Sequence, residues 1–117
     1  MTDIIVDFMA CLKKEWSGLT VVAQDQVETQ SNVIGVAIQR WIQRPEGCEV
    51  TVNVTYYPDH ASPMRSMAEW LQQFYALIQT TQPSDVLTQW RGQTAQILTD
   101  PQRVNCSVVL RQAKKVV

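Results

Sequence analysis

The side chain best suited to acid–base chemistry in this sequence is its single histidine, His60, which follows Asp59. An imidazole beside a carboxylate can act as a general base near neutral pH. A histidine in a loop more often lies in solvent or supports a turn, and no phosphate-binding loop, HExxH or GxSxG pattern accompanies this one. The sequence therefore predicts a protein that is not an enzyme. A small enzyme that uses His60 as its base is the weakest of the alternatives.

The three cysteines, Cys11, Cys48 and Cys106, are the other candidates for chemistry. They are far apart, and none belongs to a CxxC or other metal-binding spacing. Lys13 and Lys14 could lower the pKa of the Cys11 thiol, but helical periodicity places Cys11 beside an apolar stripe. We expect all three thiols to be buried and reduced, and we predict no metal ion and no cofactor.

The elements that would position any site are clearest between residues 48 and 80, where the hydrophobic period changes from two to about 3.6. Residues 48–57 alternate between apolar and polar, as a half-buried strand requires. Ser62 and Pro63 then have the pattern of a helix start. The apolar stripe of this second helix, which ends near residue 80, consists of Met67, Trp70, Leu71, Phe74, Leu77 and Ile78.

The remaining elements follow from the same periodicities and from turn residues. Residues 4–16 are predicted to form an amphipathic helix, 20–24 a short strand, 25–32 a loop and 33–44 a long strand. In that strand Ile34, Val36, Ile38 and Ile42 would share one face, and Trp41 would lie on the other. Residues 86–90 and 94–99 are weaker strand candidates, 104–111 a last strand, and 112–117 a frayed tail.

This order of elements predicts one α+β domain over residues 1–117, with a mainly antiparallel sheet and two amphipathic helices packed on one face. The chain of 117 residues is 45% hydrophobic and 18% charged, which is typical of a globular protein. Its formal net charge of −1 does not favour general nucleic-acid binding, although it leaves a local basic patch open. No apolar run approaches the length of a membrane span, so no membrane partner is predicted.

Exposed aromatic residues and the polar face of a strand are the candidate contacts with partners. Trp16 and Trp70 fit the apolar stripes of the two helices, whereas Trp41 and Trp90 do not. Aromatic residues either anchor a satellite core or dominate the buried centre of a protein interface. The candidate subunit or partner interface consists of Trp41, Glu49, Thr51, Asn53, Thr55, Tyr57 and Trp90.

The element order and several short segments resemble the phage tail terminator (tail completion) proteins, particularly the small family of Gram-positive prophages. The matching segments are the first helix, residues 25–30 (DQVETQ), the strand exit at residues 54–59 (VTYYPD) and the helix at residues 70–78. Arg91-Gly92, a turn with Asp100 and a closing strand complete the pattern. The resemblance spans nearly the whole chain. The tryptophan content and the short turn at residues 45–47 depart from it.

The resemblance implies a hexameric ring that ends polymerisation of a tail tube and offers a surface to the neck or head. The partners would be other copies of the chain, the tube protein and possibly a sheath, neck or head-completion protein, with DNA at most passing through the ring. It also implies no activity and no cofactor, and a location in the host cytoplasm during assembly and then in a virion or phage-tail-like particle. The alternative is a small cytoplasmic protein-binding module, such as a secretion chaperone or immunity-type protein.

Overall fold

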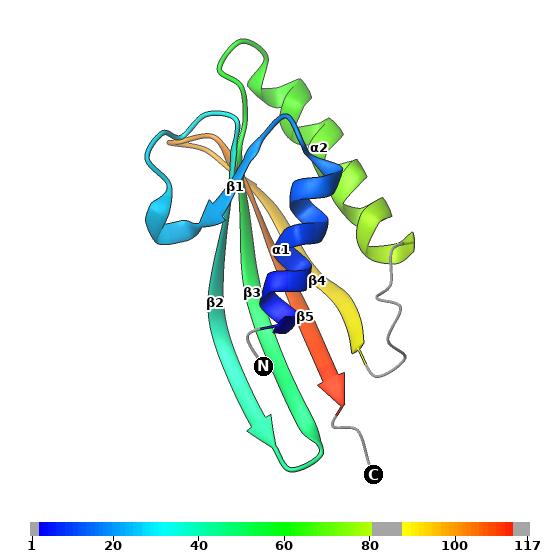
Figure 1. The fold of residues 1–117 in the computed structure, drawn as a ribbon. Coiled ribbons are helices and arrows are strands. Elements are labelled where there is room, and N and C mark those ends of the chain that lie inside the picture. Colours follow the sequence, from blue (N-terminus) through cyan, green and yellow to red (C-terminus); the bar gives the residue numbers. More distant parts are fainter. Residues whose placement is uncertain (1–2, 81–87, 114–117) are drawn as a thin grey trace.

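A mixed five-stranded sheet and two α-helices make up the fold (Figure 1). A computed structural model describes residues 3–80 and 88–113. The elements in chain order are α1 (Asp3–Glu15), β1 (Thr20–Ala23), the short 3₁₀-helix η1 (Gln24–Gln26), β2 (Val33–Arg44), β3 (Gly47–Tyr57), α2 (Pro63–Thr80), β4 (Thr88–Leu98) and β5 (Arg103–Ala113).

The sheet has the strand order β1-β2-β3-β5-β4. All neighbouring strands are antiparallel except β1 and β2, which are parallel. The predicted α+β class and mostly antiparallel sheet are thus confirmed. Parallel pairing requires the chain to return to the start of the next strand. The connection between β1 and β2, residues 24–32, therefore has to pass over the sheet.

One hydrophobic core joins both helices to alternate residues of the strands. Ile4, Phe8 and Leu12 recur every four residues in α1 and are 2%, 0% and 0% exposed. In β3, Val50, Val52 and Val54 are fully buried. The other buried members from the second helix and the last strand are Met67, Trp70, Phe74, Leu77, Ile78, Val104, Cys106, Val108 and Leu110.

A β-bulge in β2 overturns the predicted faces of that strand. Ile38 pairs with Val52 and Arg40 with Thr51, so one extra residue stands between them. An extra residue reverses the alternation of side chains beyond it. Trp41 consequently lies on the same face as Ile34, Val36 and Ile38, whereas Ile42 lies on the opposite face, the reverse of the prediction.

β4 is one strand rather than two short ones. It runs without a break through Arg91 and Gly92 and has its own irregularity between Gly92 and Thr94. β5 continues to Ala113, so residues 112 and 113 are not frayed. Residues 86, 87 and 114–117 lie outside the described part of the chain.

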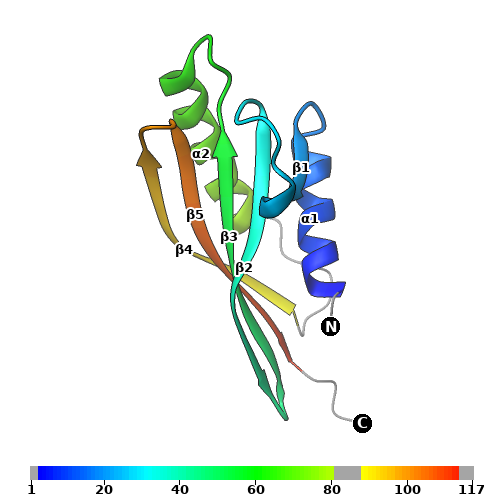
Figure 2. The same ribbon diagram turned by 90° about the vertical axis from the view of Figure 1, so that its left-hand side faces the viewer.

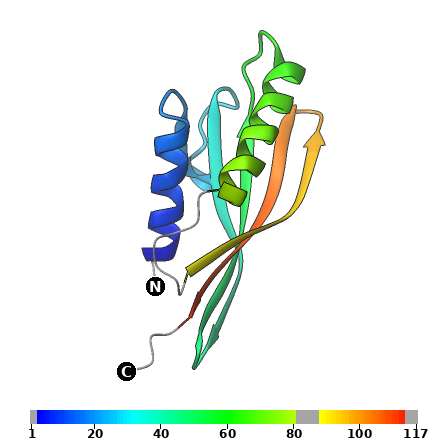
Figure 3. The same cartoon turned by 90° about the vertical axis from the view of Figure 1, so that its right-hand side faces the viewer.

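The two irregularities lie at the same level of the sheet, because Val52 pairs with Val108 and Val108 with Gly92. Bulges increase the local twist of a sheet. The sheet is strongly twisted below this level, and the β2–β3 hairpin projects away from the helices (Figures 2 and 3). We call this end, residues 40–44, 47–51, 88–92 and 109–113, the hairpin half.

Candidate functional site

The predicted interface residues of β3 divide into two groups. We call the sheet face that carries Glu49, Thr51 and Asn53 the outer face; it lies opposite the strand residues of the core. These three side chains are partly exposed. Thr55 and Tyr57 are on the same face but are both only 6% exposed. Only part of the polar face is therefore open to a partner.

The 3₁₀-helix η1 and the residues after it bury the other end of the outer face. The side-chain amide of Gln24 donates a hydrogen bond to the Tyr57 hydroxyl at 3.0 Å. A Cβ atom at Gly35 would stand 2.2 Å from Gln24 Oε1 and 3.1 Å from Val27 Cγ2. Glycine thus lets this segment lie directly on β2. The sequence contained a signal for this approach, namely a glycine within a strand rich in β-branched residues.

The two tryptophans in the predicted interface lie in different surroundings. Trp90 is 8% exposed and packs edge-to-face on Phe8, with ring centroids 5.2 Å apart. It therefore belongs to the core. Trp41 is 36% exposed, and its indole N–H donates a weak hydrogen bond to Gln43 Oε1 at 3.3 Å. Trp41 and the 51% exposed Ile38 are exposed apolar side chains on the same face of β2, at the free edge of that strand.

Charge on the outer face is organised around Glu49, the one carboxylate in the described strands. Arg111 Nη2 donates to Glu49 Oε2 at 2.8 Å across β3 and β5. This hydrogen bond lowers the pKa of Glu49, and the charges of Arg111, Arg44 and Arg40 act in the same direction, whereas desolvation opposes them. Glu49 thus lies within the field of three guanidinium groups.

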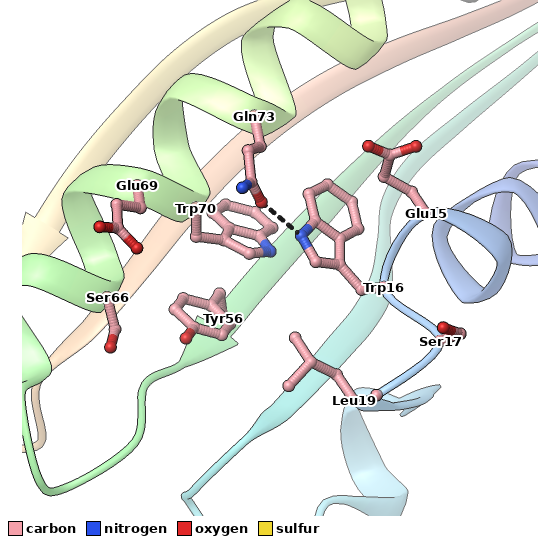
Figure 4. Close-up of a pocket in the computed structure, with 10 residues that line it drawn as sticks. Glu15, Trp16, Ser17, Leu19, Tyr56, Ser66, Glu69, Trp70 and Gln73 are labelled. Carbon is pink, nitrogen blue, oxygen red and sulfur yellow. Dashed lines mark hydrogen bonds between the residues drawn. The ribbon is translucent and has the colours of Figure 1, made fainter.

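An aromatic cluster closes the end of the core between α1, β3 and α2 (Figure 4). Tyr56 and Trp70 stack with centroids 5.0 Å apart and planes at 6°, and Trp70 stacks on Phe74 at 4.9 Å. Trp16 lies 5.3 Å from Trp70 and donates its indole N–H to Gln73 Oε1 at 3.0 Å. These contacts tie the residue after α1 to α2.

A surface pocket of about 370 Å³ lies beside this cluster. Glu15 and Glu69 are among the residues that line it (Figure 4). Burial raises the pKa of the Tyr56 hydroxyl, with smaller contributions from Asp59 and Glu69 and an opposing hydrogen bond with Ser66. A tyrosine with a raised pKa stays neutral and is a poor nucleophile. The stacked rings cover one another's faces, so the cluster serves packing rather than ligand binding.

The candidate catalytic residues do not come together. His60 is exposed, and its Nε2 lies 3.2 Å from the Gln30 carbonyl oxygen, so it supports the loop. Burial raises the pKa of Cys11 and raises that of Cys106 to about 12. Glu15 also raises the pKa of Cys11, and Lys14 lowers it without outweighing burial. Cys48 and Cys106 are buried as predicted, whereas the prediction that Cys11 is buried is wrong, because it lies only partly buried at the edge of the core. Within residues 3–80 and 88–113, no three His, Cys, Asp or Glu side chains are placed to hold a metal ion.

Comparison with known proteins adds no further site. No protein-family model and no curated protein matches this sequence. Neither α1 nor α2 has the length and apolar character needed to cross a lipid bilayer.

Proposed function

We propose that this protein is a structural, non-catalytic subunit of a hexameric ring that caps the tube of a phage tail or phage-tail-like particle. The ring would end polymerisation of the tube and join it to a neck or head. The proposal is supported by the resemblance to tail terminator proteins along nearly the whole chain. It is also consistent with the separate positions of His60 and the three thiols.

Part of this proposal is that α1 and α2 both cover one face of the sheet and leave the outer face for other contacts. Its support is the single core that contains side chains from both helices and from the same face of β3 and β5. Figure 3 draws both helices alongside the sheet, with the hairpin half extending beyond them. A subunit of this form has a rigid body and a projecting arm.

The observation that carries the proposal is the free edge of this arm. β1 pairs only with residues 33–36 of β2. Residues 37–44 pair with β3 on one side and have no strand beside them on the other, β1 side, within the described chain. This edge bears the exposed side chains of Ile38 and Trp41. Exposed aromatic and aliphatic side chains are typical of the centre of a protein interface. In a molecule of 53 × 27 × 23 Å, such an arm can reach a neighbouring subunit.

Light scattering combined with one substitution tests the ring. We expect a mass of six times 13.3 kDa, either for the protein alone or after addition of purified tail tubes. Trp41→Glu places a carboxylate at the proposed contact and should abolish the hexamer. Met64→Glu is the matched control, because Met64 is an exposed apolar side chain of α2, 61% exposed, and lies away from the arm.

Electron microscopy of particles tests the capping role separately. Tails assembled without this protein should have tubes of variable length, and added protein should restore one length with a ring at one end. A monomer that neither assembles nor binds tubes would refute the proposal. That result would favour the alternative of a small protein-binding module.

A further inference from the structure

Arginine residues are segregated on the outer face of the sheet. The sequence has six arginines, and five of them lie in strands whose register places them on this face: Arg40, Arg44, Arg91, Arg103 and Arg111. The sixth, Arg65, lies on α2 and pairs with Glu69 at 3.0 Å. The chain as a whole carries a net charge of −1, so the basic character of this face is local.

Four of these arginines form a patch in the hairpin half. Arg40 and Arg91 lie in one row across the sheet with Thr51 and Val109 between them, so their Cα atoms are about 14 Å apart at ordinary strand spacing. Arg44 lies four residues further along β2, about 13 Å from Arg40. Arg111 completes the patch. We call these four residues the arginine patch.

The arginine patch has unbalanced positive charge. Glu49 neutralises one guanidinium, that of Arg111, at 2.8 Å. Ion pairs in the described residues join only Arg111 to Glu49 and Arg65 to Glu69, which leaves Arg40, Arg44 and Arg91 without a carboxylate partner there. All three are exposed. Three guanidinium groups thus have no ion pair in the described residues, while Glu46, which lines the same pocket as Arg44, and Glu49 reduce the net positive charge of the patch.

The surroundings of the patch favour a phosphate backbone over a protein or a single strand. Thr51 is polar, and Val109 is only 8% exposed. Ile42, between Arg40 and Arg44 on β2, is partly exposed. One partly exposed aliphatic side chain does not make the apolar centre of a stable protein interface. It also lacks an exposed aromatic ring on which unpaired bases could stack, because Tyr57 is buried. The Cα atoms of Arg40 and Arg91 are far enough apart for their long side chains to reach phosphates on both sides of the DNA major groove, which is about 12 Å wide.

We propose that the arginine patch binds the sugar–phosphate backbone of double-stranded DNA without sequence preference. Arg40, Arg44 and Arg91 contact phosphates, and Glu49 holds Arg111 in place while it reduces the total attraction. With about three phosphate contacts, the binding is weak and sensitive to salt. The inference does not depend on the ring, because it concerns a surface of the isolated chain.

Fluorescence anisotropy with a labelled DNA duplex tests the inference. Each neutralised phosphate contributes about −0.9 to the slope of log affinity against log salt concentration, so three contacts predict a loss of about 40-fold between 50 and 200 mM salt. Arg40→Glu and Arg91→Glu should each weaken binding at least 10-fold at 50 mM salt. Arg65→Glu, an arginine reversal of the same size away from the patch, should change it less than twofold.

Glu49→Gln gives a result of the opposite sign. Removing the carboxylate releases Arg111, so affinity should rise severalfold and the salt slope should steepen by about 0.9. Three results would each overturn the inference. They are a loss of affinity in Arg65→Glu equal to that in Arg40→Glu, tighter binding of single-stranded DNA than of the duplex, and no binding of the duplex at 50 mM salt. If polyglutamate binds as tightly as the duplex and the same substitutions weaken its binding, the ligand of the arginine patch is an acidic protein surface and not DNA. The light-scattering mass of each variant shows whether it still forms the proposed ring, so loss of DNA binding can be distinguished from loss of the ring.

Discussion

Replacing Gly35 by alanine tests whether the η1 segment lies directly on the outer face of β2. The added methyl group would stand 2.2 Å from Gln24 Oε1, 2.9 Å from Gln24 Cδ and 3.1 Å from Val27 Cγ2. Contacts below 3 Å cannot be accommodated without movement. The Gln24 side chain must therefore move and lose its 3.0 Å hydrogen bond to Tyr57.

The expected cost follows from three contributions. Displacing the end of the flexible Gln24 side chain costs about 1 kcal/mol, the low end of the range for overpacking, and loss of a partly buried hydrogen bond costs about 0.5–1.5 kcal/mol. Reduced conformational freedom of the unfolded chain offsets about 0.4–1 kcal/mol. The free energy of unfolding should thus fall by about 0.5–2 kcal/mol, which lowers Tm by about 2–10 °C for a domain of this size.

Thermal unfolding followed by circular dichroism measures the effect, with Gly18→Ala as the matched control. No atom lies within 4 Å of a Cβ at Gly18, so this control should have unchanged or slightly higher Tm. Adding Gln24→Ala to Gly35→Ala should recover part of the lost stability, because the obstructing side chain is gone. An unchanged Tm for Gly35→Ala would show that η1 does not press on β2 and would refute the argument for burial of Tyr57.

Two further predictions concern titratable groups. Burial raises the pKa of Cys106 to about 12 and leaves the residue 1% exposed, so at pH 8 it should react with a thiol reagent only as fast as the protein unfolds. Rapid reaction in the native protein would contradict this prediction, and denatured protein serves as the control. The pKa of Glu49 is lowered in the folded state, so its contribution to stability is present above its unfolded pKa and is lost as pH falls through the folded pKa. An NMR titration should find that the pKa of the Glu49 carboxyl is lower than the ordinary value and that it rises in Arg111→Ala. An unchanged pKa in Arg111→Ala would contradict the prediction.

The periodicity of the sequence was sufficient for the elements but not for the face of every residue. Residues 33–44 form the predicted strand, yet strict alternation put Trp41 on the wrong side. The pattern of apolar residues does not reveal a bulge when the residues at the bulge are polar, as Gln39 and Arg40 are. The pairing of Trp41 with Val50 could be known only from the register of two strands.

The candidate interface could be predicted only in part from the sequence, for a similar reason. Glu49, Thr51 and Asn53 lie on the accessible part of the predicted polar face, but the polar loop at residues 25–32 gave no sign that Thr55 and Tyr57 would be covered. Trp90 preceded an Arg-Gly pair that is typical of a turn, and tertiary packing on Phe8 overrode that local preference. Whether these residues contact another subunit stays a prediction.

The arginine patch could not be predicted from the sequence, because its members come from three strands, β2, β4 and β5. Each arginine by itself is an ordinary polar residue of a strand. Only the pairing of β3 with β5 and of β5 with β4 brings Arg40 and Arg91 into one row. Net charge gave no indication either, because the acidic residues, almost all outside the strands, balance the patch.

The extra residue in β2 makes the chemistry of this surface depend on chain length rather than on residue type. Because Gln39 is unpaired in the register, deleting that one residue would restore simple alternation across residues 40–44. Arg40 and Arg44 would then exchange faces with Trp41 and Gln43 without any change in their identity. A homologue with a one-residue gap here would carry Trp41 and Gln43 on the outer face in place of both β2 arginines, although an alignment would score those arginines as retained.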